Sequence, residues 1–415
     1  MVSSSPPAVS PPLSLANERA FIRYLLARTC GTLAVQMQTV AVGWQVYAAT
    51  SDPLDLGLIG LSQFLPFILL ILPAGHAADH YDRRKILAVC YFLNMTSAVC
   101  LLGFSLLDVH AVGWVFAVMT LLGVTRAFAM PSAQALIPNL VPPELFARAT
   151  AVNSTVFQVC TIAGPTLGGL LYLAGPSVVF GTVATLLATS TVLMTRVRVG
   201  GRDATAPPAV TLRSLLSGLV FVRSKPTVLG AISLDLFAVL FGGATALLPI
   251  YARDILHTTS VGLGVLRTAP GIGAAACALV LSLTPLDRHV GRWLFAGVGV
   301  FGAATVVFGL STNIVVSVIA LMLLGAGDMV SVYLRHLLVQ LETPDEIRGR
   351  VSAVNAVFIG ASNELGEFES GITAAWFGTV RAVVFGGIAT MAVAATWAWW
   401  FPQLRRMDRL PERVR

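Results

Sequence analysis

Long apolar runs separated by short polar segments occupy most of the chain. A helix that spans a lipid bilayer needs about 20 predominantly apolar residues. Twelve runs have about this length, so the pattern predicts an all-α polytopic membrane protein with twelve transmembrane helices. The expected spans lie at about 24–49, 56–75, 86–107, 112–137, 149–174, 177–195, 227–251, 259–283, 292–311, 314–339, 350–378 and 381–401.

The composition excludes the main alternatives to a membrane protein. Of the 415 residues, 56% are hydrophobic and only 11% are charged, whereas soluble domains carry about 25% charged residues. A soluble enzyme, a disordered chain and a disulfide scaffold are therefore excluded. The five cysteines fall inside apolar runs without metal-type spacing, so we interpret them as small buried hydrophobic residues.

The longest polar interruption, 196–226, divides the expected spans into two halves of six. Within it, leucine and valine recur at helical spacing, which favours a short amphipathic helix on the membrane surface. A structured linker is the alternative. We therefore expect two six-helix bundles, at 19–196 and 226–401, joined by a central cytoplasmic loop with the amphipathic helix at 197–225. A disordered cytoplasmic tail at 1–18 precedes them, and a second cytoplasmic tail at 402–415 follows.

The two halves resemble each other in sequence. The segment 142–153 recurs at 344–355, where a proline, a glutamate, an arginine and the triplet Ala-Val-Asn keep their spacing. Two parallel six-helix repeats are a known transporter architecture, with the substrate site at the repeat interface near the bilayer midplane.

The basic residues predict the orientation of the chain. Of the two sets of alternate loops, one holds nearly all of the loop Arg and Lys residues, and the opposite set holds only Arg253 and Arg381. Arg and Lys are enriched in cytoplasmic loops. We therefore expect both termini in the cytoplasm. The net charge of +7 is explained by this topology signal, and we expect no nucleic-acid partner.

A charged loop follows the second expected span and contains Gly75, Asp79, Arg83 and Arg84. The glycine allows close helix approach, the aspartate can face a helix N-terminus, and the arginines can pair with acids of neighbouring loops. The spacing resembles the G-x-x-x-D-x-x-x-R-R/K signature of the major facilitator superfamily, although Asp82 stands where that family usually has Gly. The resemblance implies a gate that locks the cytoplasmic side when the carrier faces outward; a solvated loop is the alternative. The second half has a weaker copy, made of Asp287, Arg288, Gly291 and Arg292.

Small residues in the fifth expected span form a second motif, which contains Gly164, Pro165, Gly168 and Gly169. Small residues allow tight helix packing, and proline can bend a helix. The segment resembles the antiporter motif of the same superfamily, with Cys160 in place of its first Gly. The resemblance implies an efflux-type carrier, whereas simple helix packing is the alternative interpretation.

We single out four charged residues that lie inside expected spans: Arg126, Asp235, Asp328 and Arg335. Asp328 is the repeat partner of Arg126, and Arg335 follows Asp328 by seven residues on the same helix face. Intramembrane charges are rare and usually face a cavity or a partner. Arg126 resembles the membrane Arg of the superfamily, which implies proton coupling. For Arg126, Asp328 and Arg335, a buried structural ion pair is the alternative.

Three acids, Glu364, Glu367 and Glu369, share the eleventh expected span. Glu364 and Glu367 are three residues apart and share a helix face, whereas Glu369 points elsewhere unless Gly366 breaks the helix. Clustered acids in a low-dielectric environment oppose each other's ionisation. This suits carboxylates that carry protons or contact substrate near neutral pH, while helix packing is the alternative for one or two of them.

Uncharged polar side chains inside the spans complete the predicted cavity. They are Gln36, Gln38, Trp44, Gln45, Asn153, Gln158, Asn355 and Asn363. The chain has no phosphate-binding loop of the G-x-x-x-x-G-K-[ST] type and no H-E-x-x-H motif. We therefore expect neither enzyme activity nor a metal or cofactor, and an ion gradient rather than ATP as the source of energy.

The resemblance to the major facilitator superfamily covers about 20–400, and within it the segments 127–142 and 339–355 resemble the enterobactin-exporter-like, or transmembrane secretion effector, group. This implies a secondary transporter that exports a small organic molecule, such as a siderophore, drug or metabolite, across a bacterial inner membrane by alternating access and proton antiport. The implied partners are that substrate, protons and the lipid bilayer, and the implied state is a monomer. A lipid or lysolipid flippase of the same fold and a non-transporting membrane sensor are the alternatives.

Overall fold

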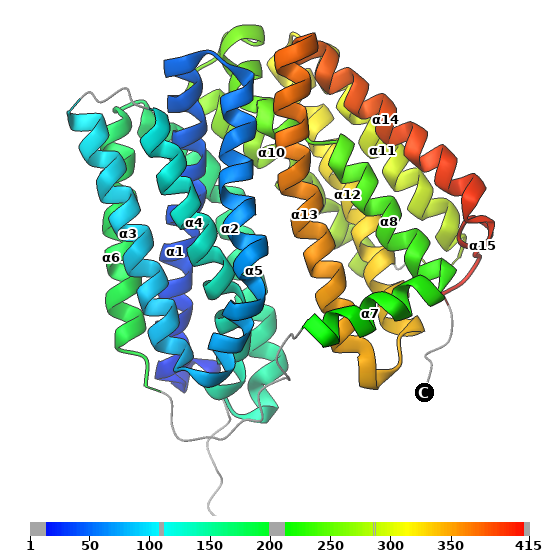
Figure 1. The fold of residues 1–415 in the computed structure, drawn as a ribbon, viewed down its shortest axis with the longest axis horizontal. Helices are drawn as coiled ribbons and strands as arrows, with labels where there is room; N and C mark the ends of the chain where they lie inside the picture. Colours follow the sequence, from blue (N-terminus) through cyan, green and yellow to red (C-terminus); the bar gives the residue numbers. More distant parts are fainter. Residues whose placement is uncertain (1–13, 108–111, 199–211, 285, 287, 411–415) are drawn as a thin grey trace, which may run out of the picture.

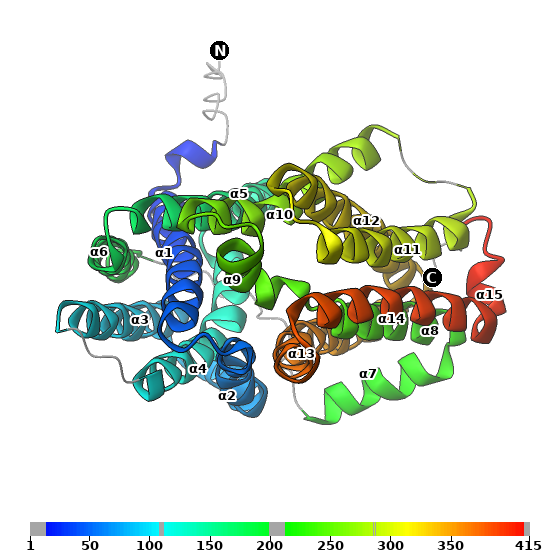
Figure 2. The same cartoon turned by 90° about the horizontal axis from the view of Figure 1, so that it is seen from above.

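The computed structural model describes residues 14–107, 112–198, 212–284, 286 and 288–410. Most of the expected N-terminal tail, the last five residues, much of the central loop and Asp287 therefore lie outside the described residues. The described part is built from helices packed into two bundles that lie side by side (Figures 1 and 2).

The N-terminal bundle contains six long helices, and two of their starts show why the sequence folds this way. Asp52 caps α2 by accepting a hydrogen bond from the Leu54 N–H at 2.9 Å, and Asp82 caps α3 through the Arg84 N–H at 3.0 Å. The helices are α1 (Arg19–Thr50), α2 (Pro53–His80), α3 (Arg83–Leu106), α4 (Val112–Leu136), α5 (Pro143–Tyr172) and α6 (Pro176–Thr195).

The C-terminal half begins with α7 (Leu212–Ser224), a short helix that packs against α8 and α13 at the edge of its bundle. Six spans follow, the first of them made of α8, η3, α9 and η4, and the short α15 is the last element that the structure describes. The elements are α8 (Pro226–Phe241), η3 (Ala244–Leu247), α9 (Leu248–Ile250), η4 (Tyr251–Ile255), α10 (Ser260–Leu283), α11 (Val290–Leu310), α12 (Ile314–Glu342), α13 (Asp345–Phe377), α14 (Thr379–Trp400) and α15 (Pro402–Arg405).

The seventh span is interrupted, whereas the sequence pattern predicted one continuous helix. It breaks after Phe241 and continues as η3, α9 and the π-helical turn η4. At Gly243 a Cβ atom would lie 2.3 Å from the Gly366 carbonyl oxygen of α13. The break therefore lies where only a glycine permits the close approach of another helix backbone.

Ten of the spans are long and apolar enough to cross a membrane by length and composition alone, counting only described residues. The remaining two long helices, α1 and α13, are more polar. Each is shielded by packing: α1 against α5 and α6, and α13 against α2 and α8. Shielding by neighbouring helices is the usual way in which polar residues are accommodated inside a membrane.

The bundles meet through two helix pairs, α2 with α13 and α5 with α10. We call the end of the molecule that holds residues 14–18, the α2–α3 loop and α15 the terminus end, and the other end the distal end. The ribbons of α2 and α13 lie close together toward the distal end and diverge toward the terminus end (Figure 1).

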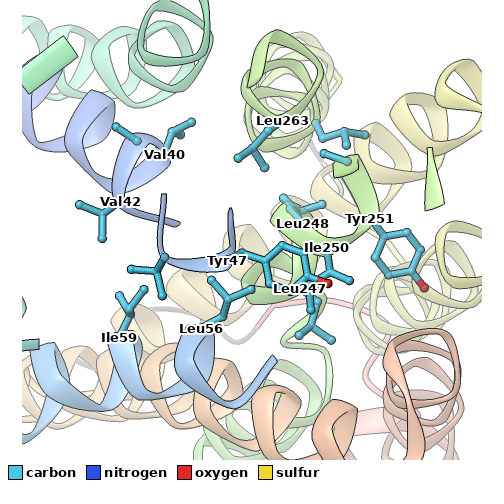
Figure 3. Packing of buried hydrophobic residues seen from close by; sticks show 14 of the residues in the cluster. Val40, Val42, Tyr47, Leu56, Ile59, Leu247, Leu248, Ile250, Tyr251 and Leu263 are labelled. Carbon is cyan, nitrogen blue, oxygen red and sulfur yellow. The ribbon is translucent and has the colours of Figure 1, made fainter. Parts of the chain in front are cut away.

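The buried apolar residues follow the same division. One cluster spans both bundles at the distal end, where Val40, Tyr47 and Leu56 lie near Leu248 and Leu263 (Figure 3). At the terminus end each bundle has its own cluster, one around Tyr24 and Leu136 and the other around Val290 and Leu404. Hydrophobic burial therefore joins the bundles at the distal end and leaves them independent at the terminus end.

Hydrogen bonds also join the bundles at the distal end. The Tyr47 hydroxyl donates to Asp254, and the Ser260 hydroxyl donates to the Gly169 carbonyl at 2.9 Å. Between described residues, the other hydrogen bonds that cross the interface lie in this half of the molecule or near the middle of the helices. The structure is thus closed at the distal end.

Gly169 offers a direct test of this closed end, because a Cβ atom there would lie 2.3 Å from the Ser260 carbonyl oxygen. We expect Gly169→Ala to destabilise the protein by about 1–3 kcal/mol through overpacking. The control is Gly181→Ala, where no atom lies within 4 Å of the added Cβ and alanine is the better helix former. Thermal unfolding midpoints should fall only for Gly169→Ala; equal shifts would contradict the close packing.

Candidate functional site

An ion pair joins the two bundles near the middle of the helices. The guanidinium of Arg126, on α4, donates to the carboxylate of Glu364, on α13. The Arg126 side chain is 48% exposed and that of Glu364 is 11% exposed, so the guanidinium is half uncovered by protein while the carboxylate is held in the interface. The Arg126 guanidinium also lies 5.2 Å from the ring centroid of Phe67, on α2.

Glu367 lies one helical turn from Glu364 and completes this interface cluster. The charges of Glu364, Arg126 and Arg267 all act on it. Arg267 comes from α10, so the cluster draws on three helices and both bundles. The sequence-based prediction of Glu364 and Glu367 on one face fits this arrangement, in which the Arg126 guanidinium binds Glu364 and the charge of Arg267 acts on Glu367.

Glycines bring α2 and α13 together around the interface cluster. A Cβ atom at Gly60 would lie 3.0 Å from the Glu367 carboxylate, and one at Gly57 would lie 3.1 Å from the Cα atom of Gly371. Small residues at such positions allow helix backbones to approach closely in membranes. The acids are therefore held against the opposite bundle by backbone packing.

Glu369 is separate from this cluster. Helix α13 is continuous from Asp345 to Phe377, so Gly366 does not break it. The Glu369 carboxylate instead accepts a hydrogen bond from the Thr373 hydroxyl on its own helix at 2.8 Å. Of the three acids predicted from the sequence, the structure brings two to the interface and directs the third to another face of the helix.

A second charged cluster is buried inside the C-terminal bundle. The Arg335 guanidinium, on α12, lies 2.9 Å from the carboxylate of Asp235, on α8, and donates to the Asn355 side-chain oxygen, on α13, at 3.0 Å. The Arg335 side chain is 2% exposed and that of Asp235 is 6% exposed. This pair therefore ties three helices of one bundle together.

Asp328 lies close to this pair and adds a second carboxylate to a single guanidinium. Its charge interacts with those of Asp235 and Arg335, and it lines a cavity of about 10 Å³ together with Asp235 and Ser331. A cavity of this size is about the smallest that holds one water molecule. Both aspartates therefore share the positive charge of Arg335.

The charged loop between α2 and α3 makes its contacts within the N-terminal bundle. Arg83 donates to the carbonyls of Ala78 and Ala135 at 3.0 and 2.9 Å. Arg84 binds the Asp82 carboxylate at 2.6 Å and, through this hydrogen bond, holds the pKa of Asp82 below its ordinary value. Gly75 is buried in α2.

Asp79 differs from the other residues of this loop motif. One of its carboxylate oxygens is buried and has no hydrogen-bond partner among the described residues. A buried unpaired carboxylate oxygen is costly, so this oxygen is an available acceptor for a partner that the present arrangement does not supply.

The glycines of the fifth span pack in two directions. Cβ atoms at Gly164 and Gly168 would lie 2.5 Å from the Gln36 side chain and 2.9 Å from the Cα atom of Met37, both on α1. Gly169 instead faces Ser260 of α10, and the Pro165 carbonyl lies against Gly264 of the same helix. The motif therefore joins α1, α5 and α10, and helix α5 runs through Pro165 without interruption.

The remaining polar candidates are scattered. Gln38 is 1% exposed, and both of its amide atoms lack a partner among the described residues, as does one oxygen of the buried Asn153. Trp44 and Gln45 are half-buried on α1, whereas Gln158 and Asn363 are exposed on α5 and α13. Buried amides without partners are the strongest of these candidates, because an unmade hydrogen bond favours binding of a polar ligand.

The weaker loop copy of the second half does not lie at the bundle interface. Arg292 lines a surface cavity at the terminus end, beside the C-terminal segment. Arg288 lies just before α11, on the exposed surface, and Asp287 lies outside the described residues. No group of three or more His, Cys, Asp or Glu residues in the described ranges is placed to hold a metal ion.

Two arginines inside the spans are absent from the sequence-based prediction, Arg28 and Arg267. Both interrupt apolar runs as Arg126 does, so the same criterion finds them. The Arg28 guanidinium lies 5.3 Å from the ring centroid of Phe157, and its Nε is buried without a partner among the described residues. Arg267 belongs to the interface cluster.

Comparison with known proteins agrees with this architecture. The chain is 25% identical over 413 residues to the enterobactin exporter EntS of Escherichia coli O1:K1, covering 96% of each protein. It is 26% identical over 410 residues to the enterobactin exporter EntS of Citrobacter koseri, covering 96% of this chain and 95% of the relative.

Solved structures share the fold at low sequence identity. An inward-facing bacterial homologue of the human lysosomal transporter Spinster has a TM-score of 0.75 at 14% identity, over 94% of this chain and 97% of that one. An inward-facing bacterial homologue of the iron transporter ferroportin has a TM-score of 0.69 at 15% identity, over 95% and 100% of the two chains.

The fold, the family model and the full-length relatives together identify a multi-pass membrane transporter of the major facilitator type. Residues 10–413 match the family model of the transmembrane secretion effectors, and the chain belongs to that family. The family and the curated relatives are transporters, which makes this protein a transporter rather than an enzyme.

The buried pair of Asp235 and Arg335 can be tested by stability. Removing one partner of a buried ion pair costs about 3–5 kcal/mol, whereas replacing both by apolar residues is often neutral. We expect Arg335→Met alone to lower the thermal unfolding midpoint strongly, because it leaves the carboxylates of Asp235 and Asp328 without their guanidinium. Arg335→Met with Asp235→Leu and Asp328→Leu should restore most of the lost stability. A triple variant that is as unstable as the single variant would contradict this mutual compensation.

Proposed function

We propose that this protein exports a small organic molecule across a bacterial inner membrane by alternating access, driven by proton antiport. The observation that carries the proposal is the Arg126–Glu364 ion pair, because it joins the two bundles through a group that a proton can neutralise. The names of the relatives as enterobactin exporters support export and favour a siderophore as the substrate class.

The coupling follows from what the interface acids can bind. Ionised Glu364 and Glu367 accept hydrogen bonds from donor groups of the substrate, and protonation removes these acceptors. Substrate and protons therefore compete for the same carboxylates, which is the requirement for exchange of one for the other. Protonation of Glu364 also removes the charge that holds Arg126, so the same event weakens a contact between the bundles.

The closed distal end indicates from which side of the membrane the substrate reaches the interface between the bundles. The bundles are joined by apolar packing and hydrogen bonds at the distal end and diverge toward the terminus end. The Arg- and Lys-rich loops favour a cytoplasmic terminus end. We therefore interpret the present arrangement as one that receives substrate from the cytoplasm, with both termini on that side.

The charged loop of the N-terminal bundle fits the role of a gate in the opposite arrangement. Asp79 keeps a buried oxygen without a partner, and Arg83 and Arg84 bind carbonyls and an acid of their own bundle. When the terminus end closes, the oxygen of Asp79 would receive a donor from the C-terminal bundle. Closure would thereby remove the cost of the unmade hydrogen bond.

The carboxylate role is tested in proteoliposomes with an imposed pH gradient and a radiolabelled or fluorescent candidate siderophore. We expect Glu364→Gln with Glu367→Gln to lower proton-driven transport at least tenfold, because the amides cannot bind and release protons. The matched control is Glu369→Gln, which makes the same chemical change on the same helix outside the cluster.

Equal transport by wild type, the double variant and the control would overturn the carboxylate role. The same vesicles distinguish the alternatives for the whole protein. Movement of labelled phospholipids or lysolipids that siderophores fail to inhibit would establish a flippase, and absence of flux with every substrate would favour a sensor.

A further inference from the structure

A cavity of about 630 Å³ opens at the terminus end of the C-terminal bundle. The elements that line it, α11, α14 and α15, include none of the helix pairs through which the bundles meet. It lies between the beginning of α11, the end of α14 and the segment around α15. Its lining includes Arg292, Arg405 and Arg406, above an apolar wall that contains Phe295 and Ala398. None of these residues takes part in the transport mechanism proposed above.

The walls of the cavity are held by close packing of the C-terminal segment on α11. A Cβ atom at Gly291 would lie 2.0 Å from the Leu404 carbonyl oxygen, so the segment rests directly on the helix backbone. The Gly291 N–H donates to the Met407 carbonyl at 2.9 Å, and Leu404 is fully buried. The glycine of the weaker loop copy, Gly291, therefore allows the C-terminal segment to pack directly on the backbone of α11.

The charge of the cavity is positive. Between described residues, Arg292, Arg405 and Arg406 form no ion pair, and all three are exposed. The acid of the lining, Asp408, is engaged by His289: it accepts a hydrogen bond from the His289 N–H at 3.2 Å and lies 3.8 Å from the ring Nε2. Three guanidinium groups thus face one carboxylate that already has partners.

Large exposed aromatic residues place this cavity at a membrane boundary. Trp293, Trp399 and Trp400 are 48%, 74% and 63% exposed, and they flank Arg292 and α15 in the sequence. Tryptophan is enriched at the level of the lipid headgroups. Basic pockets between transmembrane helices on the cytoplasmic side are known to bind lipid head groups.

We propose that this cavity binds a phosphate-bearing anion, supplied by the headgroup of an anionic phospholipid. The arginines contact the phosphate oxygens, for which the guanidinium fork is well suited. The apolar wall at Phe295 and Ala398 contacts the beginning of the acyl chains. The bound lipid would fix the C-terminal segment against α11 in the headgroup layer.

Lipid retention measures this binding. The full-length protein is purified from vesicles of phosphatidylcholine with a minor fraction of phosphatidylglycerol, and its bound lipids are counted by native mass spectrometry. We expect wild type to retain phosphatidylglycerol selectively. The triple variant Arg292→Gln, Arg405→Gln, Arg406→Gln should bind this lipid about 100-fold more weakly, because each arginine contributes about fivefold to the affinity. The charge-matched control is Arg148→Gln, Arg198→Gln, Arg223→Gln, which changes exposed arginines elsewhere at the terminus end.

Two further measurements make each outcome decisive. In one, all three arginines are replaced by lysine, which keeps the positive charge. We expect this variant to bind the lipid within tenfold of the wild-type affinity, which shows that the glutamine variant loses binding through lost charge and not through misfolding. Inorganic phosphate is then offered alone to protein held in phosphatidylcholine. Selective retention of phosphatidylglycerol by wild type supports a lipid headgroup, whereas binding of phosphate without any selective retention of phosphatidylglycerol overturns the lipid source. Equal retention by wild type, the glutamine variant and the control overturns the site.

Discussion

A charge inside a membrane must be paired, and most of this structure can be understood from how that requirement is met. In the C-terminal bundle, Arg335 is enclosed with Asp235 and Asn355, so the pair joins α8, α12 and α13. At the interface, Arg126 finds its partner in the other bundle. The first arrangement ties three helices of one bundle together, and the second is the contact on which the proposed proton coupling of the two bundles rests.

The two ends of the molecule differ in the contacts between the bundles. At the distal end a shared apolar cluster and the contact of Tyr47 with Asp254 join the bundles. At the terminus end each bundle has a separate core, and Arg83 and Arg84 bind groups within their own bundle. The apolar packing at the distal end is extensive compared with a single ion pair near the middle of the helices. Such an ion pair can therefore decide between the arrangement closed at the distal end and one closed at the terminus end only if the two are close in free energy. Alternating access requires that they are.

The helices could be predicted from the sequence because each one needs a long apolar run, and the spans lie where those runs predicted them. The break after Phe241 could not, since it depends on Gly243 meeting Gly366 from a distant part of the chain. The same limit applies to the site. Individual charges such as Arg126 and Glu364 stand out in apolar runs, but their pairing across the bundles is a property of packing. Arg267 interrupts an apolar run as Arg126 does, but only the fold shows that its charge acts on Glu367. The contact of Gly291 and Arg292 with the C-terminal segment likewise depends on packing between distant parts of the chain.

Protonation of Glu364 should change how the bundles meet, and a distance across the terminus end measures this most directly. Spin labels would be placed at exposed positions on either side, Tyr81 and Ser352, in a cysteine-free background, and their separation followed by double electron–electron resonance as pH falls. We expect the population with a short separation to grow at low pH in wild type. In Glu364→Gln it should be high at every pH. A distribution that is independent of pH and unchanged by Glu364→Gln would contradict coupling through this ion pair.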